Sequence, residues 1–115
     1  MNKYRDKSDV EINKAVAVAR GYKVMSCEES VMAYIDSGYK PFDPCNHPYD
    51  AMPIVFENNI SLHAPRFSEG WMAEYTGSDD DVNDGFQADY FDSHNQNPLR
   101  AAMEVFLMMK DTENE

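Results

Sequence analysis

Residues 97–110 of the chain read NPLRAAMEVFLMMK, and this segment gives the strongest indication of how the chain folds. Asn97 is a favoured helix N-cap and Pro98 suits the first helical position, so a helix should begin here. After Pro98, only Arg100 and Glu104 are polar before the final lysine, and they lie four residues apart on one face. A helix that is apolar around most of its circumference is buried, so we expect this C-terminal helix at the centre of the fold.

A second helix is predicted near the N-terminus, where a capping box marks its start. The Ser8 hydroxyl can accept from the Glu11 amide while the Glu11 carboxylate reaches back to the cap. Gly21 can adopt the left-handed conformation that ends a helix, so the predicted helix runs from about Asp9 to Arg20. Its apolar residues recur at the spacing of one buried stripe: Ile12, Ala15, Val16 and Ala19.

The following segment predicts short strands and then a loop. Val31–Ile35 alternates as a strand does, and an earlier strand from about Val24 is separated from it by a turn at 28–30. Residues 36–48 hold three prolines and a glycine, which predicts a structured loop.

A central helix is predicted to begin between residues 46 and 50. Pro53 is disfavoured inside a helix, so it either lies in the first turn, with Asp50 near the N-cap, or kinks the helix. Beyond it, short strands are predicted at 60–63 and at 71–76, where Trp71, Ala73 and Tyr75 alternate with other residues. Residues 77–96 are predicted as an acidic irregular loop.

These elements predict a single α+β domain over residues 1–115 with the order α-β-β-α-β-β-α. The four strands should form one short antiparallel or mixed sheet packed with helices, with the apolar C-terminal helix central. Residues 1–7 and 111–115 are expected to fray, as chain ends commonly do.

The charge of the chain is strongly negative and unevenly placed. There are 21 acidic residues against 10 Lys and Arg, a formal net charge of −11. Residues 41–98 carry eleven acids and a single base, Arg66, whereas residues 1–40 are nearly balanced. DNA affinity comes largely from clustered Lys and Arg, so no direct nucleic-acid binding is expected. No apolar run is long enough for a membrane span or a signal peptide, which predicts a cytoplasmic protein.

No catalytic residue, cofactor or metal site is predicted. The sequence lacks a nucleophile elbow, a glycine-rich phosphate loop and a dinucleotide fingerprint. Cys45 and His47 form one CxH pair, which falls short of the paired spacing of structural zinc sites, and the acids at 79–84 fail the EF-hand spacing. A small metal-dependent enzyme is one alternative function.

Acidic and aromatic side chains supply the candidate interaction surface. Tyr and Trp are favoured interface anchors, and aromatic residues make up 12% of the chain. We therefore expect a non-enzymatic protein that binds a protein partner, as a monomer or a homodimer. The surface consists of four acids and four aromatics: Asp79, Asp80, Asp81, Asp84, Tyr39, Phe42, Tyr49 and Trp71. A further alternative is a DNA mimic, whose acidic segment 41–98 would occupy the groove of a DNA-binding protein.

Three passages together resemble the NinX-like family of lambdoid phage and prophage proteins. They are SDVEINKAVAVARGYKV, DPCNHPYDAMPIVFENNISL and NPLRAAMEVFLMMKD, and they cover about half of the chain. The middle passage has Met52 where the family usually has Trp. The resemblance implies a phage or prophage origin and a bacterial cytoplasm, and a looser likeness to phage domains implies an α-β-α sandwich. It implies no activity, because none is assigned to the family.

Overall fold

The computed structural model describes residues 2–26, 29–65, 70–76 and 90–113. The order of elements is α-β-β-β-α-β-β-β-α, so the fold class is α+β. The elements are α1 (Asp9–Ala19), β1 (Val24–Ser26), β2 (Val31–Ile35), β3 (Gly38–Pro41), α2 (Pro48–Glu57), β4 (Ser61–His63), β5 (Trp71–Thr76), β6 (Tyr90–Asn95) and α3 (Pro98–Glu113).

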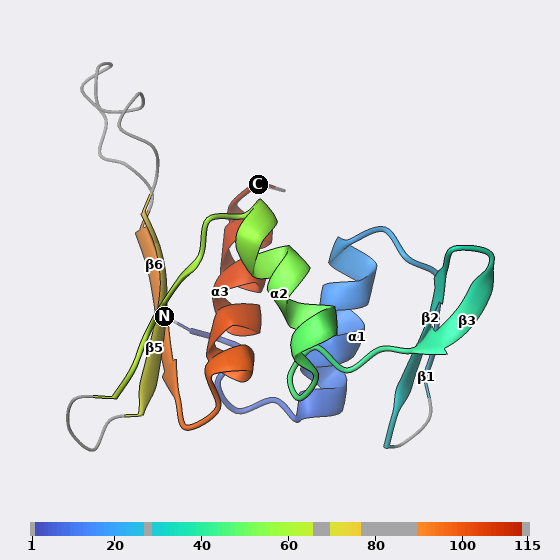
Figure 1. Ribbon diagram of the computed structural model, residues 1–115, viewed down its shortest axis with the longest axis horizontal. Helices are drawn as coiled ribbons and strands as arrows, with labels where there is room; N and C mark the ends of the chain where they lie inside the picture. Colours follow the sequence, from blue (N-terminus) through green and yellow to red (C-terminus); the bar gives the residue numbers. More distant parts are fainter. Residues whose placement is uncertain (1, 27–28, 66–69, 77–89, 114–115) are drawn as a thin grey trace.

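Two sheets enclose a layer of helices (Figure 1). The N-terminal sheet is the antiparallel meander β1-β2-β3, and the C-terminal sheet is the antiparallel meander β4-β5-β6. The N-terminal sheet packs on α1, whereas the C-terminal sheet packs on α3, and both α1 and α2 contact α3. Each sheet therefore turns one face to the helices and the other face outward.

The predicted central position of the C-terminal helix is confirmed. Every residue from Ala101 to Leu107 is buried, and α3 contacts both other helices and all three strands of the C-terminal sheet. The predicted caps are also present. The Asn97 Oδ1 accepts from the Leu99 N–H at 2.9 Å, and both bonds of the Ser8–Glu11 capping box form at 3.1 Å.

The interpretation that placed Pro53 in the first turn of the central helix is wrong. The helix begins at Pro48, with His47 as N-cap, so Pro53 lies within α2. Pro48 takes the first helical position, where its missing N–H costs nothing. Pro53 has no N–H to donate to the carbonyl one turn earlier, at Tyr49, so this helix lacks one backbone bond of its ladder.

The predicted order with four strands and one sheet is wrong, because residues 36–48 contain a strand. Asp36 and Ser37 have φ of 53° and 78°, which is the two-residue hairpin turn that joins β2 to β3. The glycine and proline of β3 stand at its two ends, Gly38 and Pro41, and β3 is an edge strand. Proline is tolerated on an edge strand, so the glycine and proline that predicted a loop are compatible with β3.

The second missed strand, β6, lies inside the predicted acidic loop of residues 77–96. Its inward positions are occupied by Phe91 and by Ser93, which pairs with Ala73 of β5. The apolar alternation of a half-buried strand is broken at Ser93, because this buried hydroxyl donates to the Glu104 Oε1 at 2.5 Å. Because a polar residue occupies an inward position, the alternation of apolar residues did not predict this strand.

Arg100 of α3 is the centre of that network. Its Nε donates to the Glu104 Oε2 at 2.6 Å, and its Nη1 to the Asp9 Oδ1 at 2.7 Å. Its Nη2 donates to the backbone carbonyls of Tyr4 at 2.9 Å and Lys7 at 2.7 Å. Burial opposes the charge of the guanidinium, but the bonds to Glu104 and Asp9 raise the pKa of Arg100. This one side chain fastens the N-terminal segment and the start of α1 to α3.

The expected fraying of residues 1–7 and 111–115 stays a prediction, but the described residues at the two chain ends contact each other. Tyr4 is buried and its hydroxyl donates to Asp111, while the Asn2 Nδ2 donates to the Glu104 Oε1 at 2.7 Å. Helix α3 continues through Glu113. The two chain ends hold each other because Arg100 draws the N-terminal segment across α3.

Gly70, which precedes β5, should tolerate no side chain. Its φ is +82°, and an added Cβ would lie 2.8 Å from the Asn95 carbonyl oxygen. We expect Gly70→Ala to lower the free energy of unfolding by more than about 2 kcal/mol, since left-handed strain alone costs about 1 kcal/mol. Urea denaturation is the measurement.

Two other glycines give matched controls for this prediction. At Gly21 an added Cβ has no atom within 4 Å, so Gly21→Ala suffers only the strain of the positive φ of +83°. At Gly38 an added Cβ also has no atom within 4 Å, and the φ is not positive. The expected order of destabilisation is Gly70, then Gly21, then Gly38. A Gly70→Ala chain as stable as the Gly38→Ala chain would contradict the geometry.

The Arg100–Glu104 pair should show strong coupling in a double-mutant cycle. Arg100→Met leaves the Glu104 carboxylate buried without its cation, which costs about 3–5 kcal/mol. The double variant Arg100→Met/Glu104→Met removes both charges, so it should be more stable than the Arg100→Met chain. Chemical denaturation measures both, and additive losses would refute the coupling.

Candidate functional site

The predicted interaction residues do not form one surface. Tyr49 is 71% exposed near the start of α2, and Tyr39 is exposed on β3. Phe42 is buried, so the expectation that it lies on the surface is wrong, because its ring packs edge-on against Tyr22 with 5.8 Å between centroids. Trp71 is half-buried at the start of β5, on the far sheet. The predicted acids Asp79, Asp80, Asp81 and Asp84 lie outside the described residues, so the DNA-mimic alternative stays a prediction.

Phe42 and Tyr49 nevertheless line one cavity of about 550 Å³, which we call the hairpin groove. It lies between the end of α1, the β2–β3 hairpin and α2. The N-terminal sheet packs on α1, whereas α2 packs on α3, and this difference leaves space between the hairpin and α2. The volume lies within the range typical of ligand-binding clefts, roughly 300–1,000 Å³.

Aromatic and aliphatic side chains form much of the hairpin groove, and charges of both signs stand among them. Its lining includes Arg20, Tyr22, Ile35, Asp36, Lys40, Tyr49, Asp50, Pro53 and Ile54. Arg20 is paired with Glu57 of α2, which joins the ends of the two helices. Burial raises the pKa of Asp50, against the opposing effect of the bond that its carboxylate accepts from the Asp43 N–H at 3.0 Å. This groove can accept an apolar or aromatic group with a polar end.

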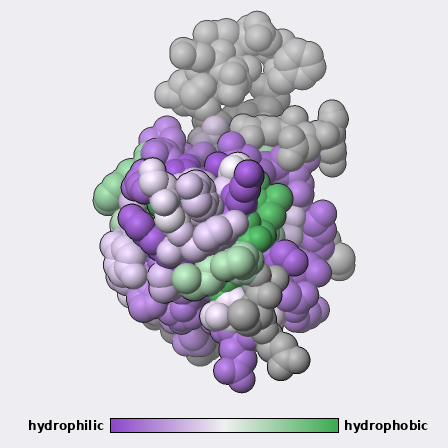
Figure 2. Space-filling model, turned by 90° about the vertical axis from the view of Figure 1, so that its right-hand side faces the viewer, coloured by the Kyte–Doolittle hydropathy of each residue, from purple (hydrophilic) through white to green (hydrophobic). Residues whose placement is uncertain are grey.

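The outer face of the N-terminal sheet carries a second aromatic feature. Tyr34 and Tyr39 are cross-strand partners, and their rings meet edge-on with 5.2 Å between centroids. They remain 45% and 41% exposed, and the neighbouring pair Met25–Met32 stands on the same face. Figure 2 looks toward this end of the molecule, and among the described residues no element covers it. The strand alternation at Val31–Ile35 already predicted that Met32 and Tyr34 share a face; it did not show that this face is open.

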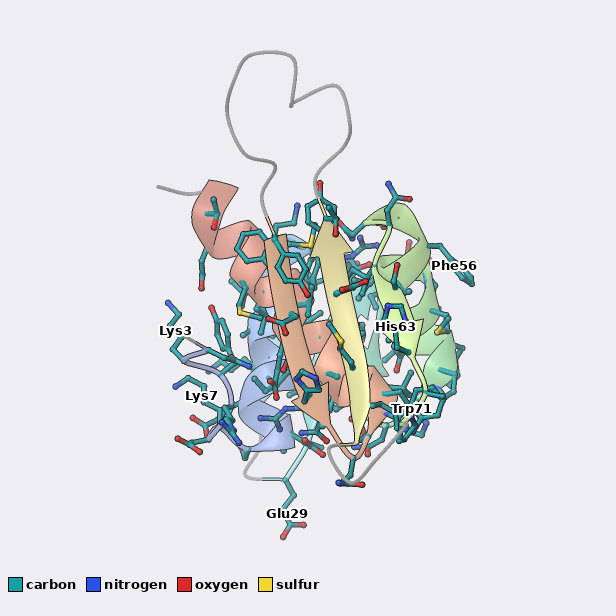
Figure 3. The ribbon with its side chains drawn as sticks, turned by 90° about the vertical axis from the view of Figure 1, so that its left-hand side faces the viewer. Lys3, Lys7, Glu29, Phe56, His63 and Trp71 are labelled. Carbon is teal, nitrogen blue, oxygen red and sulfur yellow. The ribbon has the colours of Figure 1, made fainter. Side chains whose placement is uncertain are left out.

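The outer face of the C-terminal sheet has a different chemistry. Here the His63 Nε2 lies 2.9 Å from the Glu74 Oε1, and the Tyr90 hydroxyl donates to the Glu74 Oε2 at 3.0 Å. His94 and Asp92 of β6 stand on the same face by alternation. Figure 3 shows this sheet from outside, with His63 and Trp71 labelled. The polar groups of this face already bond to one another. The better candidate site is therefore the aromatic end, by which we mean the outer face of the N-terminal sheet together with the hairpin groove.

Side-chain hydrogen bonds hold the proline-rich segment 42–50 in place. The buried Asn13 donates through Nδ2 to the Asp43 Oδ1 at 2.7 Å and accepts through Oδ1 from the Cys45 N–H at 3.1 Å. The Asn46 Nδ2 also donates to the Asp43 Oδ1, at 3.0 Å. Within the described ranges, no three His, Cys, Asp or Glu side chains gather as a metal site would require.

Cys45 and His47 lie in unlike environments. Cys45 is fully buried, whereas His47 is exposed at the N-cap of α2, with its Nε2 3.9 Å from the Asp43 Oδ2. Burial, followed by the nearby carboxylate of Asp9, raises the pKa of the Cys45 thiol well above its ordinary value. A thiol with a raised pKa is a poor nucleophile and a poor metal ligand at neutral pH, so Cys45 acts in packing.

Comparison with models of protein families identifies a match over nearly the whole chain. The model of the family described as bacteriophage P22 NinX matches residues 3–110. A search of curated proteins finds no significant relative. No helix among the described residues has the length and apolar content that crossing a membrane requires.

The thiol of the buried Cys45 should react very slowly in the folded protein. In a Cys27→Ser background Cys45 is the only cysteine, and its reaction with a disulfide reagent at pH 8 should be about 100-fold slower than in urea. The rate of thiol release measures this. Equal rates in buffer and in urea would show that Cys45 is exposed.

Proposed function

Since the chain belongs to the bacteriophage P22 NinX family, we propose that it is a phage accessory protein that binds another protein through its aromatic end. The binding region comprises the outer face of the N-terminal sheet and the neighbouring hairpin groove. It would act in the cytoplasm of the bacterium in which the phage grows.

The observation that carries the proposal is the exposed aromatic pair Tyr34–Tyr39. The two rings support each other edge-on, so they are held in place before any partner arrives. Tyrosine gives an interface a large apolar area and a polar tip at a low entropic cost, which is why it is frequent among residues that dominate binding.

Tyr49 and the hairpin groove extend this region around the hairpin. Tyr34 and Tyr39 stand on one side of the hairpin, while Ile35 and Lys40 face the groove on the other side. A partner that contacts both sides of the hairpin would bury the rings of Tyr34 and Tyr39 on one side and of Tyr49 on the other. This arrangement favours protein recognition, because aromatic anchors and an adjacent apolar pocket are the usual core of a protein interface.

The proposal predicts that polar substitution of the tyrosine pair abolishes capture of a specific partner. The tagged chain is expressed in bacteria during phage infection and in uninfected bacteria, and captured proteins are quantified by mass spectrometry. The variant Tyr34→Ser/Tyr39→Ser should capture at least tenfold less of the partner than the unaltered chain does. Truncation of an anchor residue commonly costs about 2 kcal/mol or more of binding free energy.

Phe56→Ser is the matched control, because Phe56 is 70% exposed on α2 but does not line the hairpin groove. Circular dichroism checks that all variants keep their folds. The proposal fails if the same partner is captured equally by the tyrosine variant, or if neither growth condition yields a protein above the tag alone.

A further inference from the structure

A second groove lies between α1 and α3, on the side of the helical layer away from α2. It measures about 550 Å³, and the apolar residues that line it are Ala15, Val18, Ala19 and Leu107. Lys3 and Lys7 lie on this side in Figure 3, opposite Phe56 of α2. This helix groove is separate from the surface proposed above, and the inference does not depend on that proposal.

Helix α1 has more apolar surface than its packing in the chain uses. Ile12, Val16 and Ala17 are fully buried, but Val18 is 58% exposed within the same helix. Ala15 and Ala19 lie one turn apart beside it, and both are small. Small side chains flanking an exposed valine let the backbone of another element approach closely.

Lysines surround this groove in an otherwise acidic chain. Lys7, Lys14 and Lys110 line it, together with the acids Glu11 and Asp111. Both acids are already engaged within the chain: Glu11 in the capping box with Ser8, and Asp111 with Lys3 and the hydroxyl of Tyr4. Lys7 and Lys14 form no ion pair within the described ranges, although Lys7 interacts electrostatically with the Glu11 carboxylate. With three lysines against two acids in its lining, the groove presents a small excess of positive charge to a partner.

The walls of the groove determine the form of the partner segment. Both walls are helices, whose backbone donors and acceptors are bonded within the helix. A strand buried there would find no backbone partners, whereas a helix satisfies its own hydrogen bonds. Helices also dock into apolar grooves through residues at i, i+3, i+4 and i+7.

We propose that the groove between α1 and α3 binds an acidic amphipathic α-helix of another protein. The apolar stripe of that helix would cover Ala15, Val18 and Ala19. Its flanking Asp and Glu residues would face Lys7 and Lys14.

Designed peptides test this proposal without a known partner. One is a fluorescein-labelled amphipathic peptide of about 18 residues, long enough to form a helix, with a leucine stripe flanked by Glu. The other is identical except that Lys replaces every Glu. The overall charge of −11 favours the basic peptide, so preference for the acidic one can come only from local charge in the groove. Fluorescence anisotropy should show at least tenfold tighter binding of the acidic peptide, weakening as salt rises.

Variants locate the binding. Val18→Glu places a carboxylate at an exposed position in the groove and should lower the affinity for the acidic peptide at least tenfold. Met25→Glu, on the N-terminal sheet, should change this affinity less than twofold. Lys7→Glu/Lys14→Glu should reverse the preference between the two peptides. The proposal is overturned if the basic peptide binds as well as the acidic one, or if Val18→Glu has no effect. It is also overturned if sedimentation shows a dimer that Val18→Glu dissociates, because the occupant would then be a second copy of the chain.

Discussion

The guanidinium of Arg100 is buried and bonds at once to Glu104, Asp9 and the backbone carbonyls of Tyr4 and Lys7. Removing a guanidinium from water costs several kcal/mol unless its donors find partners inside the protein. The partners here come from α3, from the first turn of α1 and from the segment before it, so the charge is compensated only when these parts are assembled. Glu104 extends the constraint to β6 through Ser93. One ion pair thus sets the N-terminal segment, α1 and the C-terminal sheet against α3.

This arrangement determines which surfaces remain for recognition. Because α1 is held against α3 and α2 packs on the same helix, the N-terminal sheet packs on the body of the molecule through α1. Its hairpin therefore projects beside α2, with tyrosines on its outer face and the hairpin groove behind it. The contact of α1 with α3 leaves the lysine-lined groove on the opposite side. Both proposed binding surfaces are consequences of how α1 is fixed.

Sequence patterns predicted the parts of the fold that depend on local rules. The caps at Ser8 and Asn97 and the apolar run of α3 were sufficient for two helices and for the central position of α3. Strand β6 was hidden because Ser93 occupies an inward position, and its role depends on a residue eleven positions away. The same limit applies to the candidate site: aromatic residue type did not distinguish buried Phe42 from exposed Tyr39. The i, i+4 spacing placed Arg100 and Glu104 on one face but did not reveal that this face is buried.

Several donors of Arg100, rather than its charge alone, hold α1 and the N-terminal segment to α3. Hydrogen–deuterium exchange of the Arg100→Lys chain tests this most directly, because lysine keeps the charge but lacks the planar fork of five donors. Amides of α1 should exchange at least tenfold faster than in the unaltered chain, while the exchange of amides that pair β5 with β6 should change little. Unchanged protection in α1, or equal acceleration across the whole chain, would contradict it.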